Sequence, residues 1–233
     1  MDKTQKKKLR KRIETDEGYE RVRENMSEFG RSGKASKLLR NSLRTLIKYA
    51  SDRYTLSRLV KEMSKVIKAD TVSARGERTL ANGDLQLLKG FEFNEGATLS
   101  SIFFAQYTST IDRATGTLKI DIPAFVPKDT INVPPATTHF KLMSAASEVD
   151  FTANSFNAAV TGTAEIAYGK QTEAAVSLSH TLTANSKQPL FLVLSIRFYQ
   201  LVNGVFYELY TDKVNAAALV QIDTVAATPP PGE

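Results

Sequence analysis

The hydrophobic period of the chain changes once, near residue 70, and this change limits the possible folds more than any other feature of the sequence. Up to about residue 69, apolar residues recur every three or four positions, which is the period of one face of an α-helix. Further along they recur every second position, as in "GTLKIDIPAF", where Leu118, Ile120 and Ile122 alternate with polar residues. Helices confined to one part of a chain and strands to the other predict an α+β fold.

We expect three short amphipathic helices in a helical region at residues 18–69. The first ends near Gly30, the second runs from Gly33 to about residue 50, and the third begins near Thr55. The apolar face of the first helix consists of Tyr19, Val22, Met26 and Phe29. Because such faces have to be buried, the sequence predicts a small helical bundle.

The remainder of the chain predicts an antiparallel β-sandwich of roughly eight strands. Strand-like runs recur every 10 to 18 residues with turn residues between them, a spacing that disfavours βαβ units. The run "PLFLVLSIRFYQLV" is apolar on both faces, as in a central strand, and the "NG" that follows it predicts a tight hairpin. The predicted layout is a basic arm at 1–17, the helical region at 18–69, a polar linker at 70–84, the β-sandwich at 85–226 and a Pro-rich tail at 227–233.

Three stretches, "RENMSEFG", "SARGER" and "LLKGFEFN", occupy residues 23–30, 73–78 and 87–94. With them the chain resembles, from about Gly18 to Ile222, an uncharacterised family of bacterial proteins that have a helical start and a β-rich remainder. The resemblance implies the same two-part layout. It implies no activity, cofactor or site residue, because none is known for that family.

The sequence offers few groups for catalysis. It contains no cysteine, which excludes disulfides, thiolate nucleophiles and thiolate metal sites. His139 and His180 are expected to be half-exposed strand residues rather than general bases or metal ligands. The stretch "GRSGKAS" at residues 30–36 lacks the glycine spacing, the Ser or Thr after the lysine and the preceding strand of a phosphate-binding P-loop. We therefore expect no catalytic residue, no cofactor and no metal ion, and a protein that is not an enzyme.

Two further features predict where the protein resides. No apolar run reaches the roughly 18 residues that are needed to span a bilayer. The basic N-terminal stretch is not followed by the apolar core of a secretory signal. Together with the lack of cysteine, these features predict a cytoplasmic protein without a membrane partner.

Charge is distributed unevenly along the chain. Residues 1–80 hold 22 Lys and Arg against 11 Asp and Glu, and the remainder holds 9 against 14, so the net charges are +11 and −5. No acid occurs between Gly30 and Ser51. The basic positions of the two later helices, which we call the basic face, are Lys34, Lys37, Arg40, Arg44, Lys48, Arg58, Lys61, Lys65 and Lys68.

Two functions fit this basic face. In the preferred hypothesis it contacts the acidic half of another copy and builds a homo-oligomer or polymer, such as a ring, a filament or a virion-type shell. Tyr49 and Tyr54 are then the expected apolar contacts, since tyrosine is enriched at interfaces. In the alternative, the basic arm and the helices bind the phosphates of a nucleic acid without sequence specificity. A third interpretation is a solvated surface that has no partner.

Overall fold

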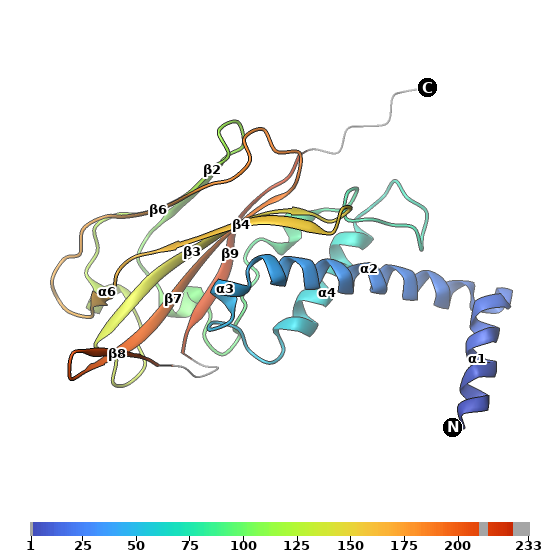
Figure 1. Cartoon of the computed structure of the whole chain (residues 1–233), viewed down its shortest axis with the longest axis horizontal. Helices are drawn as coiled ribbons and strands as arrows, with labels where there is room; N and C mark the ends of the chain where they lie inside the picture. Colours follow the sequence, from blue (N-terminus) through green and yellow to red (C-terminus); the bar gives the residue numbers. More distant parts are fainter. Residues whose placement is uncertain (1, 210–213, 226–233) are drawn as a thin grey trace.

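The computed structural model describes residues 2–209 and 214–225, and it has the predicted order of helices followed by strands (Figure 1). The helices are α1 (Lys3–Thr15), α2 (Glu20–Ser42), α3 (Arg44–Ile47), α4 (Thr55–Lys68), α5 (Leu99–Ile102) and α6 (Pro127–Thr130), with short 3₁₀ turns η1 (Glu17–Tyr19) and η2 (Leu85–Leu88). The strands are β1 (Thr108–Asp112), β2 (Thr117–Ile122), β3 (His139–Asp150), β4 (Ser155–Gly162), β5 (Ile166–Ala167), β6 (Val176–Thr181), β7 (Leu190–Val202), β8 (Val205–Glu208) and β9 (Ala216–Asp223). The predicted tail at 227–233 lies outside the described residues.

The strands of the described residues form two antiparallel sheets. The smaller sheet has the order β1-β2-β6, and the larger has the order β4-β3-β7-β8, with β5 paired to β3 and β9 paired to β7. Apolar side chains of both sheets meet in one core cluster, for example Leu118 and Leu178 from the smaller sheet and Leu142 from the larger. The α+β class and the antiparallel β-sandwich are therefore confirmed.

Strand β7 is buried on both of its faces from Leu190 to Phe198. Leu192, Leu194 and Ile196 belong to the cluster between the two sheets. Phe191 and Val193, on the opposite face, belong to a second cluster with the helices. The helices therefore form a third layer on the larger sheet, and the prediction of a central strand that is apolar on both faces is confirmed.

Helix α2 is one continuous helix, so the predicted helix end at Gly30 and helix start at Gly33 are wrong. A glycine inside a helix costs only about 1 kcal/mol relative to alanine. Tertiary contacts on both sides of the glycines outweigh this cost. Before them, Glu28 is buried and its carboxylate contacts the segment at residues 70–84; after them, Leu39 is buried in the core between the helices and the larger sheet.

The second predicted helix also ends earlier than expected. Helix α2 stops at Ser42, and the chain bends at Leu43 into the single turn α3. The bend allows Leu43, Leu46 and Ile47 all to be buried in the helix–sheet core. The third predicted helix agrees with α4, in which Leu59, Met63, Val66 and Ile67 are buried.

The predicted basic arm is the helix α1, which stands apart from the sheets (Figure 1). Its described side chains are exposed except for that of Ile13, which is partly buried. Arg23 fixes the corner between α1 and α2, because its guanidinium donates to the carbonyl oxygens of Ile13 and Asp16 at 2.9 and 2.8 Å.

The segment at residues 70–84, which the sequence predicts to be a linker, is irregular and is held closely to the helices. Glu28 accepts a hydrogen bond from the backbone N–H of Gly76, and Arg31 donates to the carbonyl oxygens of Gly76 and Arg78. Burial alone would raise the pKa of Asp70, but N–H donors from within the same segment outweigh it and hold the pKa well below its usual range.

The buried Arg197 joins β7 to the helical layer. Its guanidinium donates to the carbonyl oxygens of Thr45 and Leu46, both at 3.2 Å, and lies 4.4 Å from the centroid of the Tyr49 ring. Glu208 on the neighbouring strand β8 lies 3.9 Å away and balances the charge. These contacts fix the turn α3 on the sheet.

We expect Arg197→Ala to lower the free energy of unfolding by about 3 kcal/mol, because Glu208 then lacks its counter-charge and the Thr45 and Leu46 carbonyls lack their donor. Urea unfolding followed by circular dichroism measures this change. The control is Arg44→Ala at an exposed position, which should change stability by about 0.5 kcal/mol or less. Equal effects of the two substitutions would contradict the role given to Arg197.

Candidate functional site

The basic residues of α2 and α3 differ in their exposure. Lys34, Lys37 and Arg44 are exposed, whereas Arg40 is partly buried and its Nε is shielded from solvent without a hydrogen-bond partner among the described residues. Lys48 is exposed, and its amino group lies 4.9 Å from the centroid of the Tyr49 ring. Four of these five predicted cations are therefore exposed, and Arg40 is less accessible than its spacing suggests.

The basic residues of α4 fall into two groups. Lys61, Lys65 and Lys68 are exposed, and Lys65 pairs with Glu62 at 2.7 Å. Arg58 is partly buried and belongs to the interior of the fold. Its contacts are ion pairs with Asp52 at 2.7 Å and Glu95 at 3.4 Å, a hydrogen bond to the carbonyl oxygen of Glu92 and a ring contact with Phe91. Arg58 is thus engaged within the chain rather than offered to a partner.

The two predicted interface tyrosines are also in different surroundings. Tyr49 is partly buried, with Arg197 on its ring, and its carbonyl oxygen accepts a hydrogen bond from Asn215. Tyr54 is exposed, and Arg53 lies 4.5 Å from its ring centroid. Of the two, only Tyr54 presents its ring at the surface.

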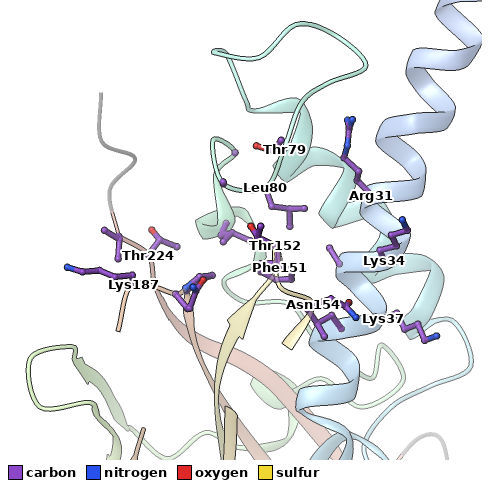
Figure 2. A pocket seen from close by; sticks show the side chains of 18 of the residues that line it. Arg31, Lys34, Lys37, Thr79, Leu80, Phe151, Thr152, Asn154, Lys187 and Thr224 are labelled. Carbon is purple, nitrogen blue, oxygen red and sulfur yellow. The ribbon is translucent and has the colours of Figure 1, made fainter. Parts of the chain in front are cut away.

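A cavity of about 950 Å³ forms a groove between α2 and the larger sheet, which we call the α2–β3 groove (Figure 2). Five separate segments form it: α2, residues 79–85, the turn between β3 and β4, residues 187–189 before β7, and residues 224–225 after β9. Its lining includes Lys34 and Lys37 of the basic face, together with Arg31 and Lys187. Sequence reasoning missed this groove, because Lys187 is far from the other cations in the chain.

All the charged side chains among the described residues that line the α2–β3 groove are positive. None of the described residues that line it is an Asp or a Glu. The nearby Asp150 is occupied, since it accepts hydrogen bonds from Gln188 and from the backbone N–H groups of Thr152 and Ala153. Figure 2 shows Lys187 on one side of the groove and Lys34 and Lys37 on the other, with the β3–β4 turn between them.

The N-terminal half of α2 projects from the body of the protein, towards α1 (Figure 1). The predicted apolar face of this segment was expected to pack in a bundle, and the structure corrects this expectation. Val22, Met26 and Phe29 are exposed, with 39, 60 and 63% of their surface accessible. We call these three residues the α2 stripe. Their spacing is that of a buried face, but no described part of this chain buries them.

A second exposed apolar surface lies on the hairpin of β7 and β8. Asn203 and Gly204 form its turn with positive φ, as the sequence predicts. Val205 and Tyr207 point to the same side of β8 and are 52 and 56% exposed, and Val202 of β7 pairs with Val205. The Asn-Gly pair identified the hairpin, but the exposure of both its faces could not be predicted from the sequence.

The two histidines lie in different environments. His139 is partly buried, with its Nδ1 3.0 Å from Thr138 Oγ1. His180 is only 5% exposed, so its expected half-exposure is wrong: the alternation of β6 turns it towards β3, where its Nε2 is 2.9 Å from Ser144 Oγ. Burial lowers the pKa of His180 to about 4, so the ring is neutral at pH 7.

The Ser144–His180 pair has the distance of a nucleophile and its base, but it lacks the other parts of such a site. Ser144 is fully buried between the sheets, where a substrate does not reach it. In the hydrogen bonds of the described residues, no carboxylate orients the imidazole. The pair therefore acts as a polar contact between the two sheets.

In residues 2–209 and 214–225, no three His, Asp or Glu side chains are grouped so that they could hold a metal ion. In the same residues, no helix is long and apolar enough to cross a membrane.

We expect His180 to make stability depend on pH. Because its pKa is about 4 when folded and 6.5 ordinarily, the unfolded chain binds more protons between these values, and stability falls as pH drops from 6.5 to 4. The full loss is about 3 kcal/mol.

Urea unfolding of the wild type and of His180→Gln at pH 7.5, 6 and 5 measures this effect. The difference between the two proteins should shrink as pH falls, because only the wild type has a histidine to protonate at this position. A difference that stays constant over this range would show that His180 titrates normally in the folded protein.

Comparison with protein-family models, with curated proteins and with solved structures gives no match to this chain. No activity, ligand or partner is therefore transferred to it from another protein.

Proposed function

We propose that this chain is a non-enzymatic assembly subunit that associates head to tail with copies of itself. In this arrangement the α2 stripe of one copy packs on the β7–β8 hairpin of the next. One observation carries the proposal: Val22, Met26 and Phe29 form the apolar face of a helix and yet are exposed on a projecting segment.

The α2 stripe favours a protein partner because its exposure is costly. Burying an apolar side chain of this size stabilises a protein by about 1.5–3 kcal/mol. The remaining apolar positions of α2, such as Leu38 and Leu39, are buried in the chain's own core. The apolar residues in the C-terminal half of α2 are therefore covered by the chain itself, whereas those in its N-terminal half would be covered by a second molecule.

The hairpin is a suitable counterpart because it is apolar and lies at the other end of the molecule (Figure 1). Val205 and Tyr207 offer an aliphatic and an aromatic side chain on one side of β8, next to Val202. Two different surfaces at opposite ends make a heterologous contact, which leads to rings if it closes and to filaments if it does not.

Charge supports the same orientation. The helical half is positive and the β half is negative, so electrostatic steering brings unlike ends together. Each exposed ion pair is worth only about 0–1 kcal/mol, and the apolar contacts therefore have to supply most of the affinity. The exposed basic residues of α2 and α4, with Tyr54 beside them, then set which partner surface is approached.

Nucleic acid binding is the alternative outcome. Helix α1 carries seven basic residues against one acid, and cations in such a row bind phosphates with an affinity that falls steeply with salt. This interpretation explains the charge but not the exposed apolar residues of α2 and β8.

We expect two double variants to identify the contact: Met26→Glu/Phe29→Glu in the α2 stripe and Val205→Glu/Tyr207→Glu in the hairpin. Each variant alone should be monomeric in size-exclusion chromatography with light scattering. An equimolar mixture should form dimers but nothing larger, because each variant keeps one intact surface.

The control is Val72→Glu/Leu87→Glu, which places the same charge at two exposed apolar residues elsewhere and should leave the assembly unchanged. Wild-type protein that is monomeric at high concentration and low salt would refute the proposal. Protein that elutes with absorbance at 260 nm and loses it at high salt, without self-association, would favour the nucleic-acid alternative.

A further inference from the structure

We infer that the α2–β3 groove binds a single-chain amphiphile with a carboxylate head group, of the fatty-acid type. Its apolar body would lie on the floor of the groove, and its carboxylate would meet the cations at the mouth. This inference does not depend on self-association, since the groove lies within one chain and includes neither the α2 stripe nor the hairpin.

The floor of the groove is apolar. Leu38, Leu80 and Leu85 line it, and all three are part of the buried cluster between the helices and the larger sheet. Phe151 at the end of β3 is partly buried against the same cluster. An apolar ligand on this floor removes its own surface from water, together with the small part of the floor that is still accessible.

The mouth of the groove is cationic. Lys34, Lys37 and Lys187 are exposed, and in Figure 2 their amino groups reach outwards from the lining. Lysine side chains commonly lay their methylene stems along apolar surface and keep the ammonium group in water. This arrangement places positive charge above an apolar floor, which is the complement of a molecule with an anionic head and an apolar tail.

Arg31 adds a charge with a fixed position. Two carbonyl oxygens, those of Gly76 and Arg78, hold its guanidinium at 2.7 and 2.9 Å. With no carboxylate among the described lining residues, these charges are not neutralised inside the groove. An anion entering it therefore meets attraction without competition from the lining.

The shape separates this ligand from other anions. The volume of about 950 Å³ lies at the upper end of the range of small-molecule sites. A nucleic acid or inorganic phosphate would use the cations and make no contact with the apolar residues of the floor. A flat membrane surface would touch the mouth but not the buried floor residues, so the concave form favours a single amphiphile.

The test is titration calorimetry of the full chain with dodecanoate below its micelle concentration. Reversal of the three mouth lysines, Lys34→Glu/Lys37→Glu/Lys187→Glu, should weaken dodecanoate binding about tenfold, from the loss of several exposed ion pairs. The matched control, Lys61→Glu/Lys68→Glu/Lys128→Glu, makes the same change of net charge at exposed lysines outside the groove and should leave the affinity unchanged.

A second variant tests the floor without changing charge. Ala81 is exposed and lines the groove, so Ala81→Trp should fill part of the cavity and weaken dodecanoate binding while the protein stays folded by circular dichroism. Dodecanol should bind equally to the wild type and the mouth variant, because it has no charge. Acetate should bind to neither.

Three results would overturn the inference: no binding of dodecanoate to the wild type, equal weakening by the mouth and control variants, or unchanged affinity in Ala81→Trp. An acidic peptide or an oligonucleotide that binds while dodecanoate does not would assign the groove to that ligand instead. Light scattering of each variant shows whether its association state has changed, which separates failure here from failure of the head-to-tail assembly.

Discussion

The burial of β7 on both faces is the constraint on which the rest of the structure depends. A strand in this position has no solvent side, so both its even and its odd residues have to be covered. The smaller sheet covers Leu192 and Leu194, and the helices cover Phe191 and Val193. Removal of either outer layer would expose one face of the buried part of this strand. The helices and the smaller sheet are therefore packed on opposite faces of the same strand, in spite of their different hydrophobic periods.

Two buried polar side chains, one on β7 and one on the neighbouring β3, join the larger sheet to the layers on its two faces. Arg197 continues the helix-facing row of β7 and holds the carbonyls of the turn α3. Ser144 on the neighbouring strand faces the smaller sheet and contacts His180. Each of the two interfaces of the larger sheet thus has a buried directional contact in addition to its apolar packing, and such contacts select one arrangement of the layers over others of similar burial.

Much of the fold could be predicted from local patterns, because they report which face of an element is buried. The run at β7, the Asn203–Gly204 turn and helix α4 were all found in this way. The predictions at Gly30 and Gly33 were wrong for a related reason. The local propensity of glycine favours a helix end, whereas the contacts that keep α2 continuous are long-range. Glu28 and Arg31 make them with a segment more than 40 residues away in the chain.

The candidate sites were harder to predict than the fold. The α2–β3 groove is assembled from five segments, so the association of Lys187 with Lys34 has no signal in the linear sequence. The α2 stripe shows a different limit. Its spacing correctly reports an apolar face, but hydrophobic period does not distinguish a face that the chain itself covers from one that it leaves open. The structure makes that distinction for Met26 and Phe29.

The corner that Arg23 fixes between α1 and α2 has a consequence for an assembled form of the protein. Two carbonyl contacts set the direction of α1, so every copy holds its cationic helix in the same orientation. In a head-to-tail chain, α1 would recur once per subunit at a constant spacing. A helix that binds a polyanion weakly on its own would then become one member of a regular row, and the row would bind with the avidity of many linked sites.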